Sequence, residues 1–242
     1  MGATGCAAVL AAADLELVAV VDPGASGREV AGLTIFGGLE ALADAACDVV
    51  VDFTVAAAAR TTLPWLARHG MHAVVGTTGF DDGDLDAVRS AFTTSNCLIA
   101  SNFAISAVLM IRFAELAAPH FDTAEIIELH HDQQVDAPSG TAIATANRMA
   151  GASTDWAPDP TEREIYPGAR GVAGPAGIRL HSVRMRGMVA HQEVILGAAG
   201  QTLTIRQDSY DRSSYMPGVV LACRRIGEHP GLTLGLDSFL GI

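Results

Sequence analysis

Apolar runs that alternate with helix-length segments are the feature that most restricts the fold of this chain. Strand-like runs rich in Val, Ile and Leu occur at residues 15–21, 48–53, 71–75 and 97–100, with helical patterns at residues 55–69 and 82–92. The strand-like runs are apolar at consecutive positions, which is typical of strands buried on both faces. Such strands, when separated by helices, form parallel sheets. The first part of the chain is therefore predicted to be an α/β domain with a parallel sheet.

The pattern changes after Phe103. A helical pattern at residues 104–118 precedes a strand-like run at 124–129 and a helix that opens at Ser139. Three strand-like runs then follow one another at residues 178–185, 189–196 and 202–206, and a last helix is expected at 215–228. Short turns between consecutive strands favour antiparallel pairing. We expect a Rossmann-like α/β domain with a parallel sheet, and an α+β domain with a mixed, largely antiparallel sheet.

Charge and cysteine placement exclude several classes of protein. The 242 residues carry 27 acidic and 15 basic side chains, a net charge of −12, with no basic stripe to neutralise nucleic-acid phosphates. An anionic substrate must therefore be held by local groups. The four cysteines lack a C-x-x-C pair, so we expect free thiols in a reducing cytoplasm and no metal site. No signal-peptide pattern and no membrane-spanning apolar run occur, so no membrane partner is expected.

The segment that is most informative about chemistry spans residues 128–142 and reads E-L-H-H-D-Q-Q-V-D-A-P-S-G-T-A. His130 and His131 end a predicted strand, and imidazoles fixed by a sheet can donate or accept protons near neutral pH. Residues 139–141 open a predicted helix, whose N-terminus attracts carboxylates and phosphates. Metal binding by the two histidines and Asp132 is disfavoured, because adjacent strand residues point to opposite faces. The segment thus predicts a proton donor beside a carboxylate site.

This segment resembles the motif E-[LI]-H-H-x-x-K-x-D-A-P-S-G-T-A of the 4-hydroxy-tetrahydrodipicolinate reductase family, nicotinamide-dependent enzymes of the diaminopimelate and lysine pathway. Every fixed position matches except one, because Gln134 stands at the family's lysine position, and all fifteen basic residues are Arg. The resemblance implies reduction of 4-hydroxy-tetrahydrodipicolinate to tetrahydrodipicolinate, with His130 as general acid or base and Gln134 at the other catalytic position. The substrate-binding residues that it implies are His131, Ser139, Gly140, Thr141 and Arg212.

The same resemblance implies a set of residues that bind NADH or NADPH. Most of them end or follow predicted strands of the first domain, at the sheet edge where open α/β folds bind ligands: Phe53, Thr54, Gly76, Thr77, Thr78, Ala100, Ser101, Asn102 and Phe103. Asp22 ends a predicted strand, where an acid bonds the adenosine ribose hydroxyls, and no Arg follows it, so NADH is favoured over NADPH. Gly2 matches the last glycine of the family's phosphate loop. The strand and glycines that precede it in Rossmann domains are absent: either the start codon is assigned too far downstream, which we favour because a missing central strand would expose sheet edges, or the protein lacks its phosphate-binding loop.

The resemblance runs from Gly2 to the end of the chain and implies its domain organisation. Residues 1–103 and 214–242 form the dinucleotide-binding domain, and residues 104–213 form the substrate-binding and tetramerisation domain. The family assembles as a homotetramer through the open sheet face of that second domain. Because Gln134 is neutral, two alternatives stay open: a divergent reductase of a related cyclic imine or enamine, and a non-catalytic nucleotide-binding homologue.

Overall fold

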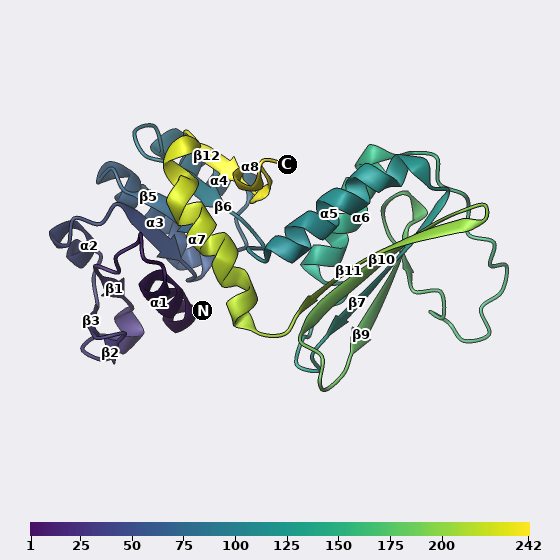
Figure 1. Cartoon of the computed structure of the whole chain (residues 1–242), viewed down its shortest axis with the longest axis horizontal. Coiled ribbons are helices and arrows are strands. Elements are labelled where there is room, and N and C mark those ends of the chain that lie inside the picture. Colours follow the sequence, from purple (N-terminus) through teal and green to yellow (C-terminus); the bar gives the residue numbers. More distant parts are fainter. The chain divides into compact units, whose positions relative to one another are not determined.

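The computed structural model describes residues 1–242 and divides the chain into two compact units (Figure 1). Unit 1 comprises Met1–Ala104 and Arg212–Ile242, and unit 2 comprises Ile105–Asp211. Five 3₁₀ helices occur at Pro23–Ala25, Ala118–His120, Pro175–Gly177, Arg212–Tyr215 and Ile226–Glu228. No helix combines the length and the apolar character that crossing a membrane requires.

A four-stranded parallel sheet in the order β12–β6–β5–β4 forms the centre of unit 1. Its strands are β4 (Val49–Asp52), β5 (His72–Val75), β6 (Cys97–Ile99) and β12 (Leu232–Leu234). The helices of unit 1 are α1 (Gly2–Ala11), α2 (Glu40–Asp44), α3 (Ala56–Arg68), α4 (Asp82–Ala91), α7 (Met216–Arg225) and α8 (Asp237–Leu240). Leu63 and Leu66 of α3 pack in one buried core with Val75 of β5 and Phe92, which follows α4. Burial of these strands under helices explains their continuous apolar sequence.

A separate three-stranded sheet in unit 1 has the order β1–β3–β2, with β1 (Val20–Val21), β2 (Glu29–Val30) and β3 (Leu33–Phe36). The prediction of a strand over residues 15–21 is wrong for residues 15–19, because only Val20 and Val21 find a partner strand, β3. The strand-like sequence of residues 15–19 has no neighbouring strand to bond. β1 and β4 each pair along one edge only.

Unit 2 is a five-stranded sheet in the order β11–β10–β7–β9–β8, with two helices on one face (Figure 1). Its elements are α5 (Ile105–Ala117), β7 (Thr123–His130), α6 (Gly140–Ala152), β8 (Val172–Ala173), β9 (Arg179–Arg184), β10 (Ala190–Ala198) and β11 (Gln201–Ser209). β7 and β9 pair in parallel, and the other neighbours pair antiparallel. The predicted fold class is confirmed: a Rossmann-like parallel sheet in one unit and a mixed, largely antiparallel sheet in the other.

Candidate active site

The helix-covered face of the unit 2 sheet changes from apolar to polar along its strands. Paired residues of neighbouring strands form rungs across the sheet, and alternate rungs share one face because side chains alternate along a strand. Three successive rungs on this face are Ile205–Val194–Ile126–Leu180, then Gln207–Gln192–Glu128–Ser182, then Ser209–Ala190–His130–Arg184. The last two rungs gather polar side chains from four strands at the end of β7 that carries the histidine motif.

Glu128 is fully buried at the centre of this group. One carboxylate oxygen lies 2.5 Å from His130 Nδ1, and each oxygen accepts a hydrogen bond of 2.8 Å from Arg184. Burial raises the pKa of Glu128, but hydrogen bonds from Arg184, Ser182 and His130 outweigh burial and hold the pKa below its ordinary value. An ionised carboxylate facing Nδ1 keeps a proton on that nitrogen and fixes the ring. Nε2 is then the nitrogen of His130 that can exchange a proton with a ligand.

Arg184 and Glu128 also tie the loop that follows β7 to the sheet. Arg184 Nη2 donates to the Asp136 carbonyl at 2.6 Å, and the Ser139 N–H donates to Glu128 Oε1 at 3.2 Å. The Ser139 hydroxyl caps α6, which begins at Gly140 and has no acidic residue in its first turn. The positive end of the α6 dipole therefore faces this loop and favours a bound anion. A carboxylate site at residues 139–141 stays a prediction, and these residues lie at this end of α6.

Two further side chains, which sequence reasoning missed, connect the sheet to α6. Gln192 is buried on β10, and its Nε2 donates to Thr145 Oγ1 at 2.7 Å. The Thr145 hydroxyl in turn donates to the Thr141 carbonyl at 2.8 Å. This chain of bonds fixes the first turn of α6 relative to Glu128, the neighbour of Gln192 in the sheet. The signal for Gln192 was a polar residue in the middle of a strand whose other helix-facing residues are apolar.

The remaining predicted substrate residues lie in turns or in a short 3₁₀ helix and not in the sheet. The Gln134 N–H donates to the His131 carbonyl at 3.2 Å in the turn after β7. The His131 side chain is exposed and that of Gln134 is half-buried, so both can reach a ligand. Arg212 opens the 3₁₀ helix Arg212–Tyr215 at the start of the second segment of unit 1. No three His, Cys, Asp or Glu side chains are grouped so that they could hold a metal ion.

In unit 1, most of the predicted cofactor residues gather at the C-terminal ends of three adjacent strands. Phe53 and Thr54 follow β4, residues 76–78 follow β5, and residues 100–103 follow β6. Ligands of open α/β sheets bind at this edge. Asp22 instead follows β1 of the smaller sheet, where its Oδ1 accepts from the Gly24 N–H at 2.9 Å, and Gly2 is the first residue of α1.

Asp52 joins the ends of β4 and β5. It is buried, and its Oδ1 accepts bonds from the Thr54 N–H and hydroxyl, both at 2.7 Å, and from the Thr77 hydroxyl at 3.2 Å. Its Oδ2 has no hydrogen-bond partner. A Cβ added to Gly76 would lie 2.2 Å from Phe53 Cε1. An aromatic ring that packs against a glycine and an unpaired buried acceptor beside it fit a planar ring that carries an amide donor, as nicotinamide does.

Two family models together match nearly the whole chain. The model described as "Dihydrodipicolinate reductase, N-terminus" matches residues 1–103, and that described as "Dihydrodipicolinate reductase, C-terminus" matches residues 106–240. The 4-hydroxy-tetrahydrodipicolinate reductase of Nocardia farcinica is 51% identical over 249 residues, covering 100% of this chain and 95% of the relative. That of Corynebacterium aurimucosum is 51% identical over 241 residues, covering 97% of this chain and 92% of the relative.

Comparison with solved structures also finds a dihydrodipicolinate reductase. The dipicolinate-bound dihydrodipicolinate reductase from Paenisporosarcina sp. TG-14 is similar with a TM-score of 0.88 at 37% identity, covering 97% of this chain and 93% of that one. An amine dehydrogenase from Mycobacterium smegmatis has a TM-score of 0.61 at 12% identity, covers 98% of this chain and 93% of that one, and shares the fold alone. Because the family models cover both units and full-length relatives are about half identical, this chain belongs to the dihydrodipicolinate reductase family.

Proposed function

We propose that this chain is an NADH- or NADPH-dependent reductase that converts 4-hydroxy-tetrahydrodipicolinate to tetrahydrodipicolinate in the diaminopimelate and lysine pathway. The observation that carries the proposal is the Glu128–His130–Arg184 group beside the N-terminus of α6. Reduction of an unsaturated ring dicarboxylate needs a proton donor next to a carboxylate site, and this group supplies both. The names of relatives that are half identical to this chain support the same activity.

The substrate belongs, in this proposal, to residues 104–213. Loss of the 4-hydroxyl group as water gives the unsaturated ring that is reduced, and His130 donates a proton from Nε2 to the ring carbon beside the one that receives hydride. It keeps the proton on Nδ1 that faces Glu128, so the imidazole ends neutral and still oriented. One substrate carboxylate binds at the N-terminus of α6. The residues proposed to bind substrate are His131, Ser139, Gly140, Thr141 and Arg212.

The cofactor belongs, in this proposal, to residues 1–103 and 214–242. When bound, the reduced nicotinamide supplies the hydride. Asp52, whose Oδ2 is unpaired, and Phe53, whose ring packs closely against Gly76, would help to hold its carboxamide and ring. We expect NADH to be preferred, because the Asp22 carboxylate would repel a 2′-phosphate. The residues proposed to contact the cofactor are Gly2, Asp22, Phe53, Thr54, Gly76, Thr77, Thr78, Ala100, Ser101, Asn102 and Phe103.

Gln134 changes both binding and chemistry relative to the lysine of the motif. A charge-assisted hydrogen bond to a carboxylate contributes about 1.5–3 kcal/mol and a neutral one about 1 kcal/mol, so the substitution weakens binding by about tenfold. A glutamine amide also cannot protonate carbon, which leaves that step to His130. The neutral side chain favours a second candidate function, reduction of a related cyclic imine or enamine with one carboxylate fewer. The intact His130 group argues against a non-catalytic homologue.

We also propose that the chain assembles as a homotetramer through the sheet face of unit 2 that α5 and α6 leave uncovered. Side chains on this face alternate with those of the core, and Ile127, Leu129, Val183 and Ile195 lie on it only half-buried. A second copy that covers this face would remove apolar surface from water. Light scattering of the purified protein measures the assembly, and a monomer would overturn this proposal.

The function is tested by cofactor oxidation with enzymatically generated 4-hydroxy-tetrahydrodipicolinate, in the wild type and in Gln134→Lys. We expect oxidation by the wild type, with a lower KM for substrate in the variant. Oxidation by the variant alone would mean that an intact site lacks only its cation. Oxidation by neither protein, with turnover of a monocarboxylate cyclic imine, would establish the second candidate function instead. No turnover of any cyclic substrate by either protein would contradict both.

A further inference from the structure

The structure places an arginine, Arg186, in contact with the loop in which the motif has lost its lysine. The substrate of the proposed function has two ring carboxylates, and the N-terminus of α6 accounts for one of them. The motif position that would supply charge to the other is Gln134, and the chain has no lysine. Two guanidinium groups of unit 2 bond to residues of the motif, those of Arg184 and Arg186.

These two guanidinium groups differ in how firmly they are held. Arg184 gives both terminal nitrogens to the buried carboxylate of Glu128, so releasing it would leave an unpaired charge in the interior. Arg186 contacts Asp132 only through Nε, at 2.9 Å, and its side chain is 94% exposed. Exposed ion pairs contribute little to stability. The guanidinium of Arg186 can therefore exchange Asp132 for another carboxylate at little cost.

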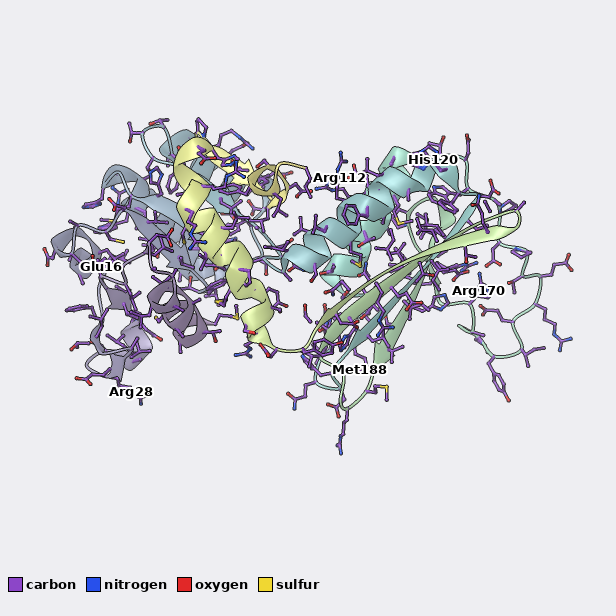
Figure 2. The ribbon with its side chains drawn as sticks, viewed as in Figure 1. Glu16, Arg28, Arg112, His120, Arg170 and Met188 are labelled. Carbon is purple, nitrogen blue, oxygen red and sulfur yellow. The ribbon has the colours of Figure 1, made fainter.

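The sheet register places Arg186 beside the motif. His130 and Arg184 are paired residues of the parallel strands β7 and β9, and the Met185 N–H donates to the His130 carbonyl at 3.1 Å. Arg186 and Asp132 each lie two residues beyond that pair, in the turns that follow β9 and β7, and their hydrogen bond joins the two turns. The loop between β9 and β10 holds Arg186 at this end of the sheet, where Figure 2 labels the nearby Met188.

Other arginines of unit 2 are committed elsewhere. Arg170 and Arg179 pair with Asp159, and Arg170 (Figure 2) also bonds Glu125 at 2.6 Å. Arg206 bonds Asp208 and Glu193 on β11 and β10. By contrast, Arg186 combines exposure, a single weak contact and direct contact with the motif loop.

We infer that Arg186 binds the second ring carboxylate of the substrate in place of the motif lysine. This inference rests on the proposed function and specifies how the site binds a dicarboxylate without a lysine. The guanidinium leaves Asp132 and gives the carboxylate a charge-assisted bond, while Gln134 adds a neutral one. A guanidinium stays protonated, so Arg186 binds substrate and His130 alone donates the proton. Arg186 therefore governs affinity and not the rate of the bound complex.

The test compares Arg186→Gln with Arg163→Gln, a matched loss of charge at an exposed arginine of the same unit. Calorimetric titration with dipicolinate and steady-state kinetics are the two readouts. Arg186→Gln should weaken dipicolinate binding and raise the substrate KM by about tenfold, with kcat unchanged. Arg163→Gln should change neither quantity. Asp132→Asn, which frees Arg186, should strengthen dipicolinate binding.

Adding Gln134→Lys to Arg186→Gln should restore binding, because the lost charge returns at the motif position. Equal dipicolinate affinity in Arg186→Gln and Arg163→Gln would overturn the inference, and so would a fall in kcat with KM unchanged. A wild-type protein that neither binds dipicolinate nor oxidises the cofactor with substrate would overturn the proposed function and, with it, the inference. The two failures are distinguishable, because the second appears in the unmutated protein.

Discussion

Replacing Glu128 with Gln should destabilise unit 2 by about 3 kcal/mol, because removing one partner of a buried ion pair costs about 3–5 kcal/mol. Glu128 is fully buried, and the Arg184 side chain that it neutralises is only 19% exposed. The substitution leaves that guanidinium in the interior without its counter-charge. The amide oxygen of Gln can still accept from Arg184 and the Ser139 N–H, which places the expected loss at the lower end of the range.

Urea denaturation followed by tryptophan fluorescence measures this loss. The chain has two tryptophans, and in a Trp65→Phe background the remaining one, Trp156, packs against the unit 2 core. Glu193→Gln is the matched control, since Glu193 pairs with Arg206 in the same sheet but at a site where that arginine is 45% exposed. Removal of an exposed pair should cost less than about 1 kcal/mol.

A double substitution separates charge burial from other effects. Arg184→Met together with Glu128→Gln removes both charges, so the combined loss should be smaller than the sum of the single losses by about 2 kcal/mol. Turnover should fall in Glu128→Gln as well, because His130 loses the carboxylate that faces Nδ1. A Glu128→Gln loss no larger than that of Glu193→Gln, or strict additivity in the double variant, would refute the reasoning.

Four further outcomes are expected. In an Arg186→Gln background, Gln134→Lys should tighten dipicolinate binding by about tenfold in calorimetry. Gly76→Ala should weaken NADH binding, measured by cofactor fluorescence, and cost about 1–3 kcal/mol of stability, because the new methyl group overlaps the Phe53 ring. Asp22→Ala should raise the kcat/KM for NADPH relative to NADH. The pKa of Glu128 is lowered in the folded chain, so its ionised carboxylate stabilises the fold above the ordinary glutamate pKa. This stabilisation is lost as pH falls through the folded pKa. Acid titration followed by Trp156 fluorescence should show the loss, and Glu128→Gln should reduce it.

Local sequence patterns predicted the elements whose burial shows as a run of consecutive apolar residues. β4, β5 and β6 are apolar at consecutive positions, so their place in a covered parallel sheet could be predicted. β12 could not, because it is a short strand whose position depends on pairing of Leu232 with Cys97, far away in the sequence. Residues 15–19 show the opposite error, since a strand pattern gives no strand where no partner is present.

Part of the candidate site could likewise be predicted from a local pattern, and part depends on strand pairing. The residues from Glu128 to Thr141 are contiguous, so their chemistry could be read from one motif. Arg184 and Gln192 come from β9 and β10, and only the strand register brings them beside Glu128. Glu128 had no predicted role of its own, because its importance depends on full burial and on four partners that only the fold brings to its carboxylate: His130, Ser139, Ser182 and Arg184.

The distribution of charge explains why a lysine at the motif could be lost. Glu128 and Arg184 neutralise each other in the interior, so this pair orients His130 and the loop but adds little net potential for an anionic substrate. Attraction must then come from the α6 N-terminus and from cations at the surface. A surface cation only has to lie near the substrate carboxylate, and β9 is the strand next to β7. An arginine in the loop that follows the neighbouring strand can therefore replace a lysine in the motif loop, whereas no such exchange is open to the buried pair.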